Sequence, residues 1–204
     1  MLTLYGSGQS RSLRVVWALE EAGLAYNYQA VKLGSKPSAE YLQLNPQGKV
    51  PTLVDDSHAQ PLVLNESAAA VSYIASLAPE KQLIPTDPVA RAKYDDFCFF
   101  ILSDLEQPLW SNGKHRMVLP EAYRIPEMLE TANWEFKRSL GALQHMMGEK
   151  KYMIEDQFTM VDVLLGQTLL WAKAFKFNMP DFTLNYIEHI MQRDAFKRAQ
   201  HAVA

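Results

Sequence analysis

Residues 45–54 read Asn-Pro-Gln-Gly-Lys-Val-Pro-Thr-Leu-Val, and residues 62–74 read Leu-Val-Leu-Asn-Glu-Ser-Ala-Ala-Ala-Val-Ser-Tyr-Ile. Val50-Pro51 lies between a glycine-containing loop and an apolar run that we interpret as a strand. Proline cannot donate to a strand ladder, and a cis bond would turn the chain tightly. A proline in this position leaves the backbone of the preceding residue available to pair with an extended ligand. We therefore predict a cis Val50-Pro51 bond beside a peptide-binding edge.

Glu66 and Ser67 stand where the short apolar run 62–64 meets an Ala-rich segment of helical character. A serine N-cap is followed by backbone N–H groups that can bind a carboxylate. The carboxylate of Glu66 beside it can hold an ammonium group. Because a carboxylate and an ammonium together make an amino-acid head group, the two motifs predict binding of a small peptide with a free amino-acid end.

The composition is that of an ordinary soluble globular protein, with 48% hydrophobic and 21% charged residues among 204. A net charge of −3 argues against nucleic acid or an anionic membrane as the main partner. No stretch approaches the roughly 18 apolar residues of a membrane span, and the first residues do not have the pattern of a signal peptide. We therefore expect a cytoplasmic protein.

Histidine and cysteine give no sign of a metal site. The five histidines show no ligand spacing, and Cys98 is the only cysteine. Cys98 lies among phenylalanines, in the run 97–100, where we expect a buried and unreactive thiol.

The first eighty residues alternate strand and helix patterns. Strands are predicted at residues 2–5, 26–31, 52–54 and 62–64, and helices from about Ser10 to Gly23, at 38–44 and at 67–77. This order implies a small mixed sheet with helices packed on it.

Three prolines, Pro79, Pro85 and Pro88, then punctuate a linker, after which no strand pattern is strong. Helices are predicted at 89–112, at 120–148, from Thr159 onward and at roughly 184–199, and Thr159 to Asp162 has capping-box spacing. The expected domains are residues 1–78 and an all-helical part at 89–204, with a linker at 79–88.

A small α/β half followed by a helical half, with Val50-Pro51 and Glu66-Ser67 at this spacing, resembles the soluble glutathione transferase family in its bacterial-like, serine-type form. The resemblance covers nearly the whole chain, and residues 193–196, Arg-Asp-Ala-Phe, are similar to the family's usual Arg-Pro-Ala-Phe. It implies an α/β thioredoxin-like N-terminal domain followed by an all-α C-terminal domain, and a homodimer. It also implies glutathione as co-substrate with no further cofactor, and a detoxification role in which the thiolate of glutathione attacks a small hydrophobic electrophile. The helix at 89–112 and the loop at 6–10 are expected to supply the electrophile pocket.

The chemistry requires a stabilised thiolate, because an ordinary thiol with a pKa of about 8.5 is only a few per cent ionised at pH 7. Hydroxyl donors, a helix N-terminus and cations supply this, and residues 6–12 offer all three. The resemblance places Ser10 where serine-type members bond the glutathione sulfur. Arg11 beside it could raise the local potential for a thiolate, or be solvated or salt-bridged. Helix capping alone would also explain Ser10. The alternatives that stay open for the hydroxyl donor are Ser7, Ser12 and Tyr5.

The resemblance also assigns the residues that hold the rest of glutathione. The backbone of Val50, next to Pro51, pairs with the cysteinyl unit. Lys49 could reach the glycyl carboxylate or be a solvated lysine. Glu66 and Ser67 hold the γ-glutamyl head group. Weaker candidates for a glutathione contact are Gln47 and Lys36.

One cation has no assigned role. Arg14 lies in the first turn of the first predicted helix, and we expect it to be solvated or salt-bridged.

Other functions remain compatible with these residues. One is glutathione-dependent isomerisation or peroxide reduction at the same site, and another is a non-catalytic scaffold that binds a protein partner. The joint presence of Pro51, Glu66 and Ser67 disfavours the scaffold, since a scaffold needs no glutathione site. The lack of a cysteine near residues 6–12 disfavours a disulfide reductase.

Overall fold

The computed structural model describes residues 1–8 and 10–203. The chain divides into two compact units, one formed by Met1–Ile84 with His189–Ala204 and the other by Pro85–Glu188. The C-terminal segment thus belongs to the first unit, although its sequence pattern groups it with the helical half. Among the described residues, none of the helices combines the length and the apolar character that crossing a bilayer requires.

The first unit is built around a four-stranded mixed sheet with the order β2-β1-β3-β4. The strands are β1 (Leu2–Gly6), β2 (Tyr26–Ala30), β3 (Thr52–Asp55) and β4 (Leu62–Leu64). β1 runs parallel to β2 and antiparallel to β3, and β4 forms an antiparallel hairpin with β3. The strands predicted from the sequence, and their mixed arrangement, are confirmed.

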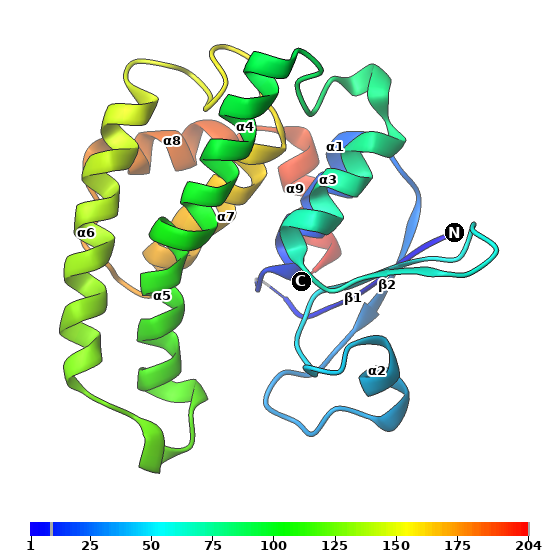
Figure 1. The fold of residues 1–204 in the computed structure, drawn as a ribbon, viewed down its shortest axis with the longest axis horizontal. Helices are drawn as coiled ribbons and strands as arrows, with labels where there is room; N and C mark the ends of the chain where they lie inside the picture. Colours follow the sequence, from blue (N-terminus) through cyan, green and yellow to red (C-terminus); the bar gives the residue numbers. More distant parts are fainter. Residues whose placement is uncertain (9, 204) are drawn as a thin grey trace. The chain divides into compact units, whose positions relative to one another are not determined.

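Four helices pack on this sheet. They are α1 (Ser12–Ala22), α2 (Ala39–Leu44), α3 (Ser67–Leu77) and α9 (Asp194–Ala202). α1, α3 and α9 lie on one side of the sheet and α2 lies on the other (Figure 1). Trp17 and Phe196 are fully buried and meet edge to face, with ring centroids 4.8 Å apart. α1 therefore packs against α9 as well as α3, and this packing holds the start of the helix, where the loop from β1 ends.

Both ends of α1 follow from local chemistry. Gly23 has a left-handed φ of 68°, and its N–H bonds to the carbonyl of Leu19, so the predicted stop is confirmed. The assigned helix starts at Ser12 rather than at Ser10, because the first turn is tight and the N–H of Leu13 bonds to the carbonyl of Ser10. Arg11 holds the N-cap position without a side-chain capping bond, and the hydroxyl of Ser10, one residue earlier, accepts the N–H of Ser12 at 3.2 Å in the manner of a cap.

The single helix expected at about 184–199 is wrong, because two helices occupy this stretch. α8 (Asp181–Met191) and α9 are separated at Arg193, whose backbone is extended with ψ of 132°. The Nε and Nη2 atoms of Arg193 donate to the two carboxylate oxygens of Glu21 at 2.6 and 2.7 Å. The break therefore lets one guanidinium form a two-point ion pair with α1.

The second unit is helical. Its helices are α4 (Pro88–Phe100), α5 (Glu106–Gly113), α6 (Glu127–Met147), α7 (Met160–Ala174) and most of α8, with π-helical segments at Ile101–Leu105 and Lys114–Val118. A short 3₁₀ turn lies at Glu121–Tyr123, and another, Pro79–Lys81, lies at the end of the first unit's N-terminal segment. The long helix predicted at 89–112 is present, but it continues to Val118 through the two π segments. Cys98 is buried, and burial raises the pKa of its thiol to about 12, which confirms an unreactive cysteine.

Two helix starts in this unit show the effect of capping and of proline. The predicted capping box is confirmed, since the N–H of Thr159 donates to Asp162 at 2.8 Å. α6 starts later than the predicted residue 120, because Pro126 disfavours helical backbone at Ile125.

Candidate functional site

The loop before β3 is held in place through its own backbone. The Val50-Pro51 bond is cis, as predicted. The carbonyl of Lys49 accepts hydrogen bonds from the phenol of Tyr41 and, at 2.9 Å, from the amide of Asn45. The backbone that would pair with an extended ligand is thus fixed by the side chains of Tyr41 and Asn45. The side chain of Lys49 is exposed.

Thr52 joins this loop to the start of α3. Its buried hydroxyl donates to Oδ1 of Asn65 at 2.9 Å, accepts from the amide of Asn45 at 3.2 Å and lies 3.0 Å from the phenol of Tyr41. The amide of Asn65 donates to the carbonyl of Leu44 at 3.0 Å. Because Asn65 directly precedes Glu66, the two sequence motifs belong to one hydrogen-bonded framework.

The start of α3 differs by one residue from the sequence interpretation. Ser67 is not the N-cap: Glu66 occupies the N-cap position with extended backbone (φ −96°, ψ 124°), and Ser67 is the first helical residue. The side chain of Glu66 makes no capping hydrogen bond and is exposed, whereas Ser67 is 5% exposed. The carboxylate of Glu66 is therefore not used to cap the helix.

Arg14 is the residue that sequence reasoning missed. Its side chain is fully buried, and its Nη1 donates to the hydroxyl of Ser67 at 3.2 Å. Of the two expectations for Arg14, solvated or salt-bridged, the first is wrong, because this face of α1 packs against α3. The one sign in the sequence was a cation inside the apolar run from Leu13 to Leu19.

The three serines of the loop before α1 have different environments. Ser12 is fully buried, and its hydroxyl accepts the N–H of Ser7 and the hydroxyl of Ser10, each at 3.0 Å. A Cβ at Gly6 would come within 2.9 Å of the Cβ of Ser12, so this close approach requires glycine. Ser7 and Ser10 are partly exposed, which leaves them better placed than Ser12 to meet a ligand.

Two other candidates near this loop are Arg11 and Tyr28. Arg11 directly precedes α1 and is partly exposed. Burial raises the pKa of Tyr28, and a hydrogen bond with the backbone of Gly8 opposes this shift. The ring of Tyr28 lies beside Gly6, so a second aromatic hydroxyl that the sequence did not single out borders the serine loop.

Tyr5 lies on the other face of the sheet. Its ring is 5.8 Å from that of Tyr41, on α2, and both line a cavity of about 360 Å³ under the loop at 31–38. Lys36 lines the same cavity. Because Gly6 contacts Ser12 while Tyr5 alternates to the opposite face, Tyr5 is a poor candidate for the hydroxyl donor.

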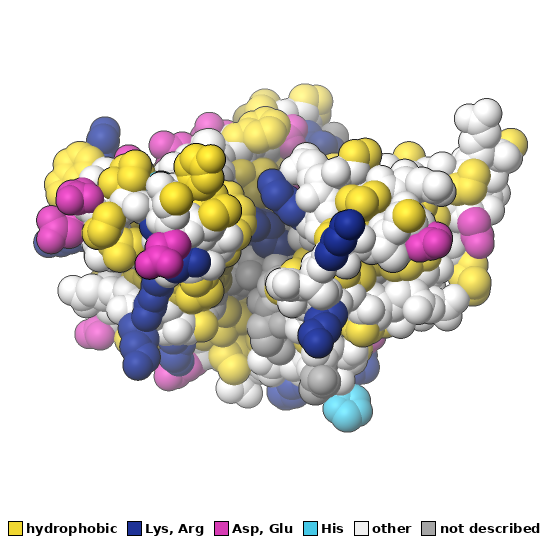
Figure 2. Space-filling model, turned by 90° about the horizontal axis from the view of Figure 1, so that it is seen from below, with side chains coloured by type: hydrophobic (Ala, Val, Ile, Leu, Met, Phe, Trp, Pro, Cys, Tyr) yellow, Lys and Arg dark blue, Asp and Glu magenta, His cyan; other side chains and the backbone are white. Residues whose placement is uncertain are grey.

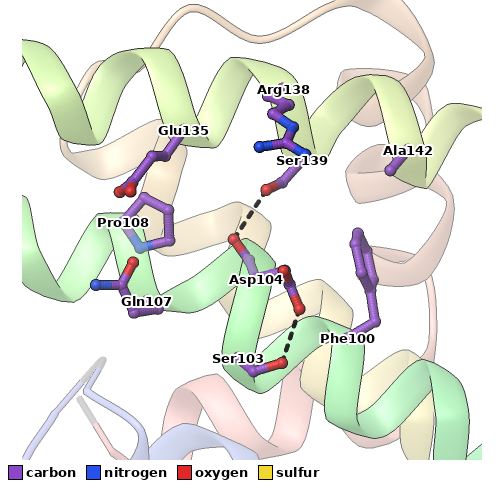
Figure 3. A pocket seen from close by; sticks show the side chains of 9 residues that line it. All are labelled: Phe100, Ser103, Asp104, Gln107, Pro108, Glu135, Arg138, Ser139 and Ala142. Carbon is purple, nitrogen blue, oxygen red and sulfur yellow. Dashed lines mark hydrogen bonds between the residues drawn. The ribbon is translucent and has the colours of Figure 1, made fainter.

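A second cavity, of about 270 Å³, lies within the helical unit between α6 and the helix formed by α4 and α5 (Figure 3). Ser139 of α6 donates to the backbone carbonyl of Asp104 at 2.9 Å, and Ser103 donates to the carboxylate of Asp104 at 2.8 Å. None of the residues predicted to bind glutathione lines this cavity, since all of them are in the first unit.

Neither the charge on the visible surface nor the described titratable residues indicate a further site. On the face seen in Figure 2, Lys and Arg side chains lie scattered among uncharged and apolar ones. Within residues 1–8 and 10–203, no group of three or more His, Cys, Asp or Glu side chains could hold a metal ion.

Comparison with known proteins places this chain among named relatives. The family described as glutathione S-transferase, N-terminal domain, matches residues 10–77. The chain is 32% identical to the stringent starvation protein A homolog of Coxiella burnetii, over 97% of this chain and 90% of that protein. It is 30% identical to glutathione S-transferase U21 of Arabidopsis thaliana, over 92% and 83%.

A solved structure described as a ternary complex of BphK, a bacterial GST, has a TM-score of 0.86 and 28% identity, with 98% of each chain covered. This similarity over both units confirms the predicted thioredoxin-like domain followed by helices.

Proposed function

This chain belongs to the glutathione S-transferase family, and we propose that it binds glutathione across its two sequence motifs and transfers it to small electrophiles. The observation that carries the proposal is the hydrogen bond between Thr52 and Asn65. It couples the backbone at Val50, beside the cis proline, to the start of α3. A tripeptide that pairs with Val50 and ends in an amino-acid head group fits such a framework.

The head group of glutathione is assigned to Glu66 and Ser67. The carboxylate of Glu66, which makes no capping hydrogen bond, suits the ammonium of the ligand. The hydroxyl of Ser67 and the first N–H groups of α3 suit its α-carboxylate. The exposed ammonium of Lys49 is assigned to the glycyl carboxylate.

The thiol is assigned to Ser10, with Arg11 beside it. Lowering a thiol pKa by two units takes about 2.7 kcal/mol of differential stabilisation. A hydroxyl donor, a helix start and a cation together are of that order. The burial of Ser12 supports Ser10 as the donor.

The test is binding followed by turnover. Isothermal calorimetry with glutathione should show one site per chain, and an activated aryl halide should react with glutathione faster in the presence of the protein. The double variant Val50→Pro, Glu66→Ala serves as the binding-deficient control. Absence of glutathione binding by the wild-type protein would overturn the proposal.

A non-catalytic scaffold is the second candidate, and one observation favours it. The Coxiella relative, at 32% identity, is named a stringent starvation protein A homolog rather than a transferase. Glutathione binding without turnover of any halide, epoxide, peroxide or cis-alkene substrate would favour this candidate. Turnover of only the alkene or only the peroxide would favour the isomerase or the peroxidase.

We also propose a homodimer and a cytoplasmic location. Val89 and Phe99 on α4 and Trp134 on α6 are each more than 60% exposed, which is unusual for large apolar side chains in one helical unit. A symmetric contact between two copies would cover them. The cytoplasm is where glutathione is kept reduced.

A further inference from the structure

We propose that Arg14 is a positioning residue that makes the site selective for the α-carboxylate of its ligand; this rests on the proposed glutathione site. Arg14 has no exposed surface, and Ser67 is 5% exposed. Their contact joins α1 to α3 across 53 residues of sequence, with Nη1 3.2 Å from the hydroxyl oxygen. Neither of the two sequence motifs, Val50-Pro51 and Glu66-Ser67, contains this arginine, and the proposed chemistry of the thiol does not use it.

The hydrogen bond between Arg14 and Ser67 has only one possible direction. A guanidinium has five N–H donors and no acceptor, so Ser67 must accept from Arg14. This bond occupies one of the two lone pairs of the hydroxyl oxygen and keeps the hydroxyl proton turned away from Arg14, where it is available to donate. Ser67 therefore presents a donor to its ligand, which suits a carboxylate oxygen better than an ammonium.

The guanidinium of Arg14 stays protonated throughout the accessible pH range, so it presents only N–H donors to Ser67 at any pH. A carboxylate that binds at Ser67 would lie next to the residue that this charge contacts directly. Glu66, exposed and adjacent, is left for the ammonium. The two residues thereby assign one orientation to an amino-acid head group.

Arg14 is also held rigidly. α1 and α3 pack against each other, and the residues on both sides of Arg14, Leu13 and Val15, are fully buried. The guanidinium is consequently confined, and it confines the rotamer of Ser67. A lysine could keep the charge but would present a single ammonium in place of a planar group.

The experiment compares two ligands by calorimetry. One is glutathione, and the other is γ-aminobutyryl-cysteinyl-glycine, which has the same backbone and thiol but no α-carboxylate. The variants are Arg14→Met and Arg14→Lys. The matched control is Arg193→Met, which removes a guanidinium from another contact with α1, the ion pair with Glu21.

Arg14→Met should weaken glutathione binding at least tenfold and binding of the analogue less than threefold, so that the selectivity between the two ligands collapses. Arg14→Lys should fall between wild type and Arg14→Met. Arg193→Met should change both affinities by the same small factor. Loss of affinity for both ligands by one common factor in Arg14→Met would show a purely structural role and overturn the inference.

Two further outcomes are separated by the same experiment. A wild-type protein that binds neither ligand refutes the proposed function and this inference with it, whereas one that binds glutathione with unchanged selectivity in Arg14→Met refutes the inference alone. Should Arg14→Met fail to fold by circular dichroism, Arg14→Lys, Ser67→Ala and the double variant form a cycle. If Arg14 acts through Ser67, the two single variants and the double variant should lose the same selectivity between the two ligands. Additive losses would mean that the two residues act independently and would overturn the inference.

Discussion

The hydroxyl of Ser10 donates to the hydroxyl of Ser12 at 3.0 Å, so a sulfur that binds at Ser10 must compete with a buried acceptor for one proton. Ser10 also accepts the N–H of Ser12 at 3.2 Å, which ties its side chain to the first turn of α1. Turning the proton from Ser12 toward a ligand breaks only the first of these bonds. Capping and thiolate stabilisation are therefore compatible roles for Ser10.

Replacing Ser10 by alanine should raise the pKa of the bound glutathione thiol by roughly one to two units. The reason is that a hydrogen bond to a charged group contributes about 1.5–3 kcal/mol, and one pKa unit is about 1.4 kcal/mol. Glutathione affinity should stay nearly intact. Titration of the thiolate absorbance in the bound complex measures the shift.

Ser12→Ala and Ser7→Ala are the controls for this prediction. Ser12→Ala removes the competing acceptor, so the thiol pKa should not rise. Loss of the cap in Ser10→Ala lowers the free energy of unfolding by about 1 kcal/mol without acting on the thiol. An unchanged pKa in Ser10→Ala together with a rise in Ser7→Ala would transfer the role to Ser7.

Glu66→Ala should weaken glutathione binding by roughly 1.5–3 kcal/mol, because it removes the partner of a charged amine. Thermal stability should change little, since the side chain of Glu66 is exposed and makes no capping bond. Calorimetry gives the affinity, and Glu80→Ala is a matched control, being an exposed glutamate of the same unit. Wild-type affinity in Glu66→Ala would refute the assignment.

Local patterns were sufficient for most elements of the first unit. The apolar runs of β3 and β4, the glycine after α1 and the proline at residue 51 each act over a few residues, and each prediction from them holds. The spacing of the two motifs also had physical meaning, because Thr52 and Asn65 are bonded directly.

Contacts between distant residues could not be predicted in the same way. Arg14 bonds to Ser67 across 53 residues and Arg193 pairs with Glu21 across 172. The role of a cation in an apolar run, such as Arg14, cannot be inferred until the residue that it contacts is known. The break between α8 and α9 likewise accompanies the ion pair of Arg193 with the distant Glu21. The choice among three serines likewise required their burial, which only the fold determines.

The protein should have a mass near twice the 23.2 kDa of one chain in light scattering at micromolar concentration. Phe99→Glu should shift it toward the mass of one chain, because a charge at the centre of an apolar contact is strongly unfavourable. Tyr123→Glu, at another exposed aromatic residue of the same unit, is the control. A monomer mass for the wild-type protein would contradict the proposed dimer.

Acid should remove stability that Tyr73 and Asp55 provide together. Tyr73 donates to Asp55 at 2.6 Å, and this bond, helped by the N–H of Ser57, lowers the pKa of Asp55 to about 2. A carboxyl whose pKa is lowered in the folded state stabilises that state above its unfolded pKa, and the contribution is lost as pH falls from about 4 toward 2.

Tyr73→Phe should accordingly lower the free energy of unfolding by about 1 kcal/mol at pH 7 and by much less at pH 2. Urea unfolding at pH 7, 4 and 2 measures the difference, with Tyr123→Phe as an exposed control. A loss of the same size at all three pH values would show that the tyrosine acts by packing alone.

Asp162 should be the most important polar residue for the stability of the helical unit. It is fully buried and accepts the N–H of Met153 at 2.9 Å, the N–H of Thr159 at 2.8 Å and the phenol of Tyr186 at 2.7 Å. These donors come from the loop before α7, from its N-cap and from α8. One carboxylate thus holds three segments at a single point.

Asp162→Ala should lower the free energy of unfolding by at least about 3 kcal/mol, because it leaves four buried donors without this acceptor, the hydroxyl of Thr159 at 3.3 Å among them. Each such group costs about 1–3 kcal/mol. Tyr186→Phe removes one donor and its bond together, so it should cost only about 1 kcal/mol. Asp181→Ala, at an exposed aspartate of α8, should stay within about 0.5 kcal/mol of wild type. Urea unfolding ranks the three variants. Equal losses in Asp162→Ala and Tyr186→Phe would mean that the bonds to Met153 and Thr159 contribute nothing, and that the capping box stabilises α7 no more than an ordinary helix start would.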